Sequence, residues 1–192
     1  MNIMSVMDVM KRLGAFFLDI LQVVVFAVAI FLFLYLLVVQ PHKIKGASME
    51  PNFPDGEFLL TDKISYRLGK PQRGDVIVFK APESEGDEFI KRVIGLPGDS
   101  VSIQNNTVFI NNKQLDEILY LDKAIVISGG VFLREGATVT VPENEYFVLG
   151  DNRPRSSDSR AWGFVKIDKI TGRAWFVYWP LDSLGTVKKI AY

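Results

Sequence analysis

The sequence predicts a mainly β protein, an antiparallel barrel-like domain or a set of packed sheets, behind a single N-terminal transmembrane helix. Residues 20–39 are apolar apart from one glutamine and carry no charge. After Pro41 the chain becomes a series of short apolar runs separated by Gly, Pro and Asn, which favour turns between strands. Helical patterns are few in this second part, so an all-β domain is expected there.

Composition excludes several classes of site. A chain of 192 residues holds one sizeable domain and an appendage, and its formal net charge of zero argues against a nucleic-acid surface. Without cysteine there are no disulfides, no thiol catalysis and no cysteine-built zinc site. The single histidine, His42, argues against a histidine-built metal centre. No glycine motif for phosphate is present. Together with the lack of cysteine and the single histidine, this means that neither a metal nor a cofactor is expected.

Residues 15–40 are predicted to cross a membrane. About twenty apolar residues span a bilayer core, and a buried globular helix of this length would show a polar face. A cleaved signal peptide is the competing interpretation, with a shorter apolar region of about 7–15 residues and small residues at the cleavage site. The sequence Gln-Pro-His-Lys at 40–43 is not such a site, so the segment is expected to be retained.

The predicted span sets the domain boundaries. Residues 1–14 are expected to form a short tail, and residues 41–192 the β-rich domain, within which the weakly patterned segment 111–136 reads as a small insertion. Two cations precede the span and two follow it closely, so the positive-inside rule leaves the orientation open.

Short strands with turns between them are expected along the second part of the chain. Asn105-Asn106 between two apolar runs favours a two-residue hairpin turn. The last run contains Trp175 and Trp179 and is interpreted as a buried strand rather than a binding site. The predicted strands are 57–61, 75–79, 89–94, 101–104, 107–110, 131–133, 138–141, 146–149 and 170–179.

Two cations interrupt the apolar run at 89–94. Because strand side chains alternate between faces, Lys91 shares one face with Phe89 and Val93, and Arg92 points to the other. A buried charge is costly unless it is paired or loses its proton, and arginine keeps its proton. On the strand alone, both cations are expected to reach water at a sheet edge; a buried, neutral Lys91 is the alternative.

Ser48 follows Gly46 and Ala47, small residues that let a substrate backbone approach closely. Most such serines only bond their own loop. A Ser-His-Asp triad would need His42, six residues upstream, which is about 20 Å along an extended chain. A Ser-Lys pair needs only a neutral lysine, and burial of Lys91 would lower its pKa from about 10.4 toward about 7.

A dense polar loop follows the strand predicted at 146–149. Residues 150–160 are rich in hydroxyls, carboxylates and guanidinium groups. The loop is either a solvated surface segment or a layer of groups around the lysine. In the second case a hydroxyl would orient the amine, and Asp158 would pair with Arg160 or Arg92.

Four segments, in this order behind an N-terminal anchor, resemble the bacterial type I signal peptidases. These are the membrane-bound serine proteases that remove signal peptides from exported preproteins. The resemblance covers nearly all of the chain, and the segments in order together are far more specific than any one alone. They are Ser48-Met49-Glu50-Pro51, 73–80, 91–99 and 150–160.

The resemblance implies a role for several residues. Ser48 would be the nucleophile and Lys91 the general base. One hydroxyl would hold the lysine amine, and an ion pair with a further arginine nearby would support it; these residues are Ser156, Asp158, Arg160 and Arg92. Substrate contacts would come from Glu88, Phe89, Ile90, Gly46 and Ala47.

The resemblance also implies topology and partners. The N-terminus would be cytoplasmic and the catalytic domain would lie on the outer face of the bacterial plasma membrane. Cleavage would follow small residues, typically in Ala-X-Ala, with pockets lined by apolar side chains such as Phe53, Phe79 and Ile90. The implied partners are preprotein signal peptides, the lipid bilayer and the secretion translocon, without nucleic acid or cofactor.

The chain departs from the family pattern near the serine. Asn52 and Phe53 stand where the family often has threonine and leucine. Gly46 stands where some members place a serine as a side-chain donor to the oxyanion. The oxyanion hole is therefore assigned to the Ser48 backbone N–H, with the second donor left open, and one such donor affects the rate by about 10²–10³-fold.

Three other functions fit less of the sequence. A peptidase-like assembly factor that has lost catalysis would typically lack the serine or the lysine, and both are present here. A self-cleaving Ser-Lys repressor would carry a DNA-binding module where this chain has its apolar span. A membrane-anchored β domain that only binds a partner leaves the four ordered segments unexplained.

Overall fold

The computed structural model describes residues 3–82, 86–122, 125–190 and 192. The chain divides into two compact units, Met1–Val38 and Val39–Tyr192. The first is one helix and the second contains the strands, so the change in sequence texture near Pro41 corresponds to a change in architecture.

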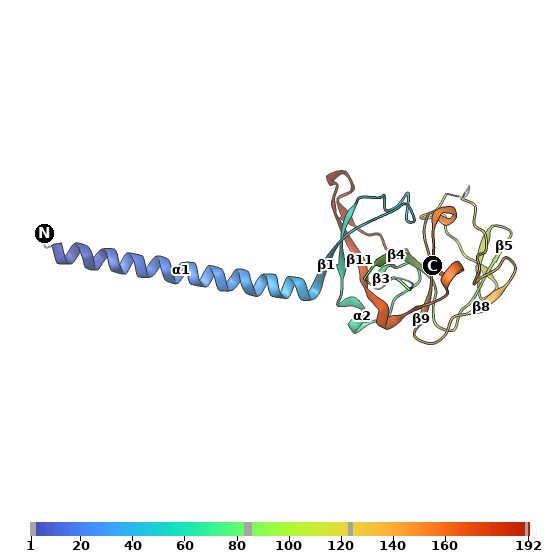
Figure 1. Cartoon of the computed structure of the whole chain (residues 1–192), viewed down its shortest axis with the longest axis horizontal. Coiled ribbons are helices and arrows are strands. Elements are labelled where there is room, and N and C mark those ends of the chain that lie inside the picture. Colours follow the sequence, from blue (N-terminus) through green and yellow to red (C-terminus); the bar gives the residue numbers. More distant parts are fainter. Residues whose placement is uncertain (1–2, 83–85, 123–124, 191) are drawn as a thin grey trace. The chain divides into compact units, whose positions relative to one another are not determined.

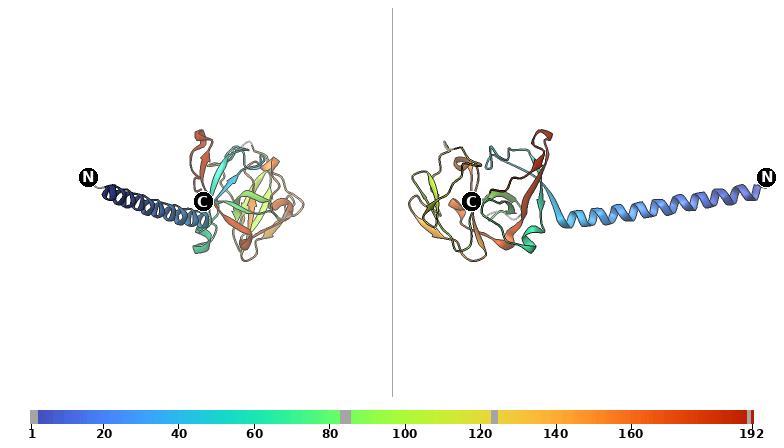
Figure 2. Two further views of the ribbon diagram at one scale, coloured as in Figure 1. Left: turned by 60° about the vertical axis from the view of Figure 1, so that its left-hand side comes forward. Right: turned by 180° about the vertical axis from the view of Figure 1, so that it is seen from behind.

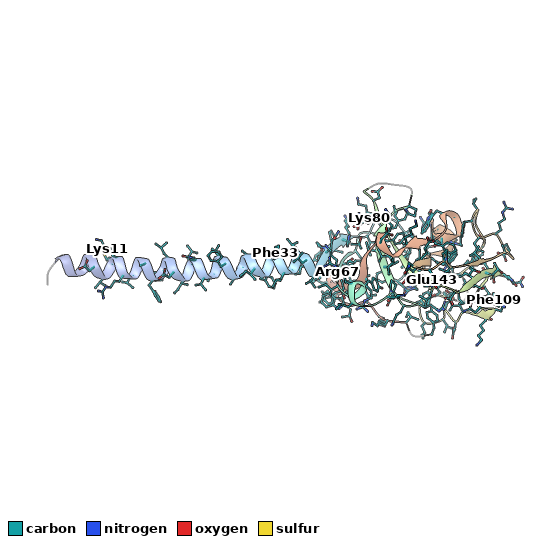
Figure 3. The ribbon with its side chains drawn as sticks, turned by 90° about the horizontal axis from the view of Figure 1, so that it is seen from below. Lys11, Phe33, Arg67, Lys80, Phe109 and Glu143 are labelled. Carbon is teal, nitrogen blue, oxygen red and sulfur yellow. The ribbon has the colours of Figure 1, made fainter. Side chains whose placement is uncertain are left out.

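The first unit is the continuous helix α1 (Ile3–Val38) (Figure 1). The most apolar 18-residue window of its section Asp8–Val38 has a mean hydropathy of 2.9, and none of that window is buried. At about 1.5 Å per residue, its 31 residues exceed the ~30 Å of a bilayer core. By length and composition α1 is a candidate membrane span, and side chains such as Lys11 and Phe33 project from it (Figure 3). It begins within the predicted tail and ends at Val38, before residue 40.

The larger sheet of the second unit is antiparallel and runs in the order β1-β2-β11-β3-β4-β9-β10, with β12 paired to β11. Its strands are β1 (Val39–Lys43), β2 (Phe58–Asp62), β3 (Val76–Lys80), β4 (Glu88–Gly95), β9 (Glu145–Leu149), β10 (Val165–Lys166), β11 (Ile170–Trp179) and β12 (Gly185–Thr186). Among the described strands β1 and β10 remain the two ends of this order, so the sheet is not a closed barrel. The packed-sheet alternative is the one observed.

The smaller sheet runs in the order β7-β6-β5-β8 and lies beside the larger one (Figures 1 and 2). Its strands are β5 (Ser100–Gln104), β6 (Thr107–Ile110), β7 (Lys113–Gln114) and β8 (Thr138–Thr140). The predicted hairpin is confirmed: Asn105 and Asn106 join β5 to β6 with φ of 48° and 63°. Both values are the positive φ that a type I′ turn requires, and Asn tolerates them well.

Short helices occupy some of the connections between strands. They are the α-helices α2 (Ser65–Leu68) and α3 (Ser159–Trp162) and the 3₁₀ helices η1 (Arg153–Arg155), η2 (Ile167–Lys169) and η3 (Leu181–Ser183). η1 and α3 both fall in the polar loop predicted at 150–160 or directly after it. That loop is therefore built structure rather than a free surface segment.

Three apolar clusters fill the second unit. One joins the two sheets through Ile94 and Phe147 of the larger and Ile103 of the smaller. The other two pack against opposite faces of β3 and β4, one around Met49 and the other around Phe79. Both faces of β4 are thus covered by apolar side chains, so the environment of Lys91 and Arg92 on this strand is a buried one.

Two expectations about strands are wrong. The run 131–133 is not a strand: Phe132 and Leu133 donate their backbone N–H groups to the Arg160 carbonyl, and only Leu133 is fully buried. The strand at 170–179 is confirmed, but Trp175 and Trp179 are 42% and 52% exposed rather than buried.

Candidate active site

β4 carries both candidate cations into the interior. Lys91 is 4% exposed and Arg92 is 3% exposed, although their side chains leave opposite faces of the strand. Lys91 pairs in register with Ile77 of β3, and Arg92 pairs with Val76. The expectation that both cations reach water is therefore wrong, because each face of this strand is covered by one of the apolar clusters.

Lys91 contacts Ser48 through its side-chain amine. The lysine amine donates a hydrogen bond of 2.7 Å to Ser48 Oγ and another of 2.9 Å to the carbonyl of Ile90. The amine also lies 5.3 Å from the centre of the Phe89 ring. Within the described part of the chain, no carboxylate forms an ion pair with it.

Burial lowers the pKa of Lys91 from 10.5 to about 8, while the more distant Asp158 and Asp151 act in the opposite direction. The charged amine lacks the water that would solvate it, and the nearest polar partners are neutral. A substantial fraction of this lysine is thus an uncharged amine at mildly alkaline pH, hydrogen-bonded to a serine hydroxyl.

The loop that carries Ser48 is fixed from both sides. Met49 is fully buried in one apolar cluster, and Asn152 donates from its backbone to the Ser48 carbonyl at 3.0 Å. The Asn152 side chain donates to the Ala47 carbonyl at 2.9 Å. Gly150 permits this approach, because a Cβ there would collide with the Ser48 carbonyl oxygen and with Ser156 Oγ.

Arg92 is held by a carboxylate that the sequence interpretation missed. It donates to both oxygens of Asp151, at 2.8 and 2.6 Å, and Asp151 is fully buried. Asn52 donates to the same carboxylate at 2.9 Å, and the Arg92 guanidinium lies 4.2 Å from the Tyr120 ring centre. Asp151 lies two residues after the end of β9, next to the glycine that opens the polar loop. That position was the signal available in the sequence.

The ion pair predicted for Asp158 is present. Arg160 donates to both oxygens of Asp158, at 2.7 and 2.8 Å, and Asp158 also accepts from the Gly150 N–H at 3.1 Å. Of the two partners considered for Asp158, Arg160 is the one observed and Arg92 is not. The pair therefore braces the polar loop at Gly150, next to the carbonyl of Ser48.

Ser156 stands apart from its expected contact. Its Oγ is buried and has no hydrogen-bond partner among the described residues, although the resemblance assigns it to the lysine amine. It lies against Gly150, close to the serine loop. A buried hydroxyl without a hydrogen-bond partner lowers the stability of the fold by about 1–3 kcal/mol. Ser156 carries this cost directly beside the Ser48 loop.

A groove of about 370 Å³ runs up to Ser48 and Lys91. Its walls are residues 42–45 on one side and 86–91 on the other, and apolar side chains such as Leu59 and Val78 contribute to its lining. Of the residues predicted to contact substrate, Glu88, Phe89 and Ile90 line this groove, whereas Gly46 and Ala47 are not among its lining residues.

Some predicted contacts of the groove are replaced by others. Phe53 and Phe79 are buried in separate apolar clusters and do not line it. The Gly46 N–H donates to Asp55 at 2.7 Å, so it is already engaged. Ser157 of the polar loop lines the groove instead, a residue that sequence reasoning did not single out.

His42 does not take part in a triad. Its Nε2 lies 2.6 Å from Glu88 Oε2 and its Nδ1 lies 2.9 Å from Thr61 Oγ1. The ring is therefore engaged at the groove wall, away from the Ser48 hydroxyl. Among the described residues, no group of three or more His, Cys, Asp or Glu side chains is arranged to hold a metal ion.

Comparisons with known proteins agree on one family. A family model described as signal peptidase, peptidase S26, matches residues 17–179. The chain is similar to probable signal peptidase I-2 of Synechocystis sp., with 40% identity over 153 residues, 77% of this chain and 66% of that one. It is also similar to signal peptidase IB of Staphylococcus aureus strain COL, with 35% identity over 179 residues, 86% of this chain and 92% of that one.

A solved structure is similar as well. It is a crystal structure of a signal peptidase I from Enterococcus faecalis V583, with 40% sequence identity and a TM-score of 0.45. The match covers 54% of this chain and 96% of that one.

Proposed function

Since this chain belongs to the signal peptidase family S26, a family of serine peptidases, we propose that it cleaves signal peptides from preproteins with a Ser48–Lys91 dyad. The cut follows small residues, in sites of the Ala-X-Ala type. The observation that carries the proposal is the 2.7 Å hydrogen bond between a buried lysine amine and a serine hydroxyl at the end of a groove.

The dyad needs one proton transfer to begin. Once Lys91 has lost its proton, the Ser48 hydroxyl donates to the amine, which removes the proton as Oγ attacks the scissile carbonyl. The amine then donates that proton to the leaving nitrogen, and an acyl-enzyme remains on Ser48. A water molecule activated by the same amine releases the product.

Neighbouring groups hold this geometry. The Asp158–Arg160 pair and Asn152 fix the loops around the Ser48 carbonyl, and the Arg92–Asp151 pair fixes the start of the polar loop from the other face of β4. We assign the oxyanion to the Ser48 backbone N–H and leave the second donor open. In the acyl-transfer steps, Ser156 accepts a hydrogen bond from the lysine amine.

The groove suits an extended peptide. β9 pairs with β4 only from Arg92 to Gly95, while β3 pairs with β4 from Glu88 onward. The Asp87 carbonyl and both backbone groups of Val93 form hydrogen bonds on the side toward β3. Backbone groups alternate in direction along a strand, so the N–H and C=O groups of Glu88 and Ile90 point to the other side, toward the groove.

The opposite wall is the outermost strand of the sheet, β1. The backbone groups of Ile44 form hydrogen bonds with Gly56 and Glu57. Because backbone groups alternate in direction along an extended chain, the N–H and C=O groups of Lys43 and Lys45 point the other way, away from these partners. Among the described strands none pairs with these two edges, so a substrate strand between them gains main-chain hydrogen bonds on both sides. Shallow apolar pockets select small side chains.

In the proposed membrane topology, the Ser48–Lys91 dyad lies on the same side of the membrane as the cleavage sites of its substrates. α1 anchors the chain in the plasma membrane with its N-terminus in the cytoplasm and the β unit on the outer face. Signal peptides are themselves held at the bilayer, so confinement to one surface raises their effective concentration. The secretion translocon is the proposed source of the substrate.

The proposal is tested by cleavage in detergent micelles. The substrate is a preprotein with one Ala-X-Ala site, and the enzymes are wild type, Ser48→Ala and Lys91→Ala, with thermal melts as the control for folding. We expect wild type to cut after the second alanine and both folded variants to be inactive. Equal behaviour of all three would reject the dyad and favour a peptidase-like assembly factor.

A further inference from the structure

The single histidine forms a bridge across the substrate groove. His42 belongs to β1 and Glu88 to β4, and three strands separate these two in the sheet order. Their side chains nevertheless meet at 2.6 Å, and both residues line the groove. The contact therefore joins the two walls of the groove rather than two neighbours on one strand.

The bridge is held at both ends. The His42 ring contacts Thr61 Oγ1 at 2.9 Å, and Thr61 is fully buried. The second carboxylate oxygen of Glu88 accepts a hydrogen bond from Thr171 Oγ1 of β11. The side chains of His42 and Glu88 are only 14% and 26% exposed. Most exposed ion pairs contribute little because both side chains are mobile, whereas here each partner is fixed by a further contact.

The bridge and the dyad lie apart along the groove, with Gly86 and Asp87 lining it beyond Glu88 on the β4 side. Successive antiparallel pairings from β1 to β4 make these two strands run in the same direction. Both walls therefore run from the bridge toward the dyad, His42 toward Ser48 and Glu88 toward Lys91. Glu88 lies three positions before Lys91 on β4, which is about 10 Å at ~3.3 Å per residue.

We propose that the His42–Glu88 bridge is the end wall of the substrate groove and sets which bond is cut. This rests on the proposed function. Space for about 10 Å of extended chain admits about three residues before the scissile bond. The fourth meets the bridge, and the rest of the signal peptide turns out of the groove there. A substrate running in the direction of β1 and β4 places its N-terminal side against the wall and its carbonyl at Ser48.

The bridge determines which peptide bond of the substrate reaches Ser48 and does not take part in the bond cleavage itself. Neither side chain contacts the Ser48 hydroxyl or the Lys91 amine, so both are positioning residues. Without the wall, a signal peptide can slide further toward the open end, and bonds on the C-terminal side of the normal site then reach Ser48. The predicted change is therefore directional.

The test uses a preprotein whose normal site is followed by a run of alanines, so that several successive bonds satisfy the small-residue rule. Products of the full-length enzyme in detergent micelles are identified by mass spectrometry. We expect wild type to cut essentially one bond. In His42→Ala and Glu88→Ala, the share of cuts one or two residues further toward the C-terminus should rise by about tenfold.

Four further variants make the test specific. The double variant should match the single variants, because the two side chains act as one unit. Glu88→Gln keeps one acceptor oxygen and replaces the other with an NH₂ donor, which the Thr171 hydroxyl or the neutral His42 ring can accept, so it should retain the wild-type register. Thr171→Val, a milder change, should shift the register partly even where an alanine variant is unstable. Glu143→Ala, an exposed carboxylate labelled in Figure 3, is the matched control and should change nothing.

A single unchanged cleavage site in folded, active His42→Ala and Glu88→Ala would overturn the proposal. So would a register shift of equal size in Glu143→Ala. Failure of the proposed function looks different, because wild type itself would then give no product that depends on Ser48, and both proposals would be overturned together.

Discussion

Two cations stand next to each other in β4, and their surroundings differ. Lys91 is buried on one face against Phe89 and Ile77, with only neutral hydrogen-bond partners, Ser48 and the Ile90 carbonyl. Arg92 is equally buried on the other face, where Asp151 accepts two of its hydrogen bonds. Burial lowers the pKa of Lys91. Burial also acts to lower the pKa of Arg92, but the hydrogen bonds and the charge of Asp151 outweigh it and raise that pKa.

This contrast shows how one strand supplies both a base and a brace. A buried cation without a carboxylate tends to lose its proton, which is what a general base requires. A buried cation with a bidentate carboxylate stays charged and orders the loops that contact it. Exchanging or removing the partners should therefore affect activity at Lys91 and stability at Arg92.

The largest effect is expected from a change of cation type. Lys91→Arg should lower the rate of signal-peptide cleavage by more than about 10³-fold, because arginine does not become a neutral base. Arg92→Lys is the matched control: it keeps a cation for Asp151 and should retain far more activity. Initial rates in detergent micelles measure both, and near-normal cleavage by Lys91→Arg would contradict the assignment of the base.

Removing the carboxylate should act mainly on stability. Asp151→Asn leaves the Arg92 charge buried without its partner, so the free energy of unfolding should fall by about 3–5 kcal/mol. Urea unfolding of the full chain in micelles, followed by tryptophan fluorescence, measures the change. Asp168→Asn, at an exposed carboxylate, is the control; an equally small loss in both variants would show that the Arg92 pair does not brace the fold.

Removing the lysine should stabilise the protein at neutral pH. The folded-state pKa of about 8 lies below the value of 10.5 for the free side chain, so the unfolded chain binds the proton more tightly. The resulting cost is fully present below pH 8, on the order of 3 kcal/mol, and disappears as the pH rises toward 10.5. Lys91→Met should thus gain stability at pH 7 and little near pH 10.5. A gain that does not depend on pH would contradict this.

A smaller effect is expected at Ser156. Its hydroxyl is buried without a partner, so Ser156→Ala should not lower the melting temperature. If the hydroxyl accepts from the lysine amine during acyl transfer, cleavage should fall by about tenfold, mainly in kcat. Ser183→Ala, at an exposed hydroxyl, is the control for both measurements. Unchanged kcat in Ser156→Ala would remove this residue from the mechanism.

The sequence predicted most of the fold because its local signals agree. The apolar run, the Asn105-Asn106 turn and the alternating strands each have a direct physical cause, and the structure has each of them. The run 131–133 was misjudged because its backbone N–H groups find a partner at Arg160, which is distant in sequence. The exposure of Trp175 and Trp179 was missed because apolar composition indicates a strand without telling which face is covered.

The candidate site was predicted less evenly. The approach of Ser48 to Lys91 followed from the chemistry of a buried lysine and from the family resemblance. The partner of Arg92 did not, since Asp151 and Asp158 are both carboxylates in one loop and only the fold assigns them. The bridge from His42 to Glu88 depends on how β1 and β4 face each other, which no local pattern specifies.

The most direct test of the neutral-lysine account is the pH dependence of kcat/KM for cleavage of an Ala-X-Ala preprotein. With the pKa of Lys91 at about 8, kcat/KM should rise by about tenfold between pH 7 and pH 9 and then level off. A profile that is flat from pH 6 to pH 10, in an enzyme still dependent on Ser48, would show that Lys91 is not the base.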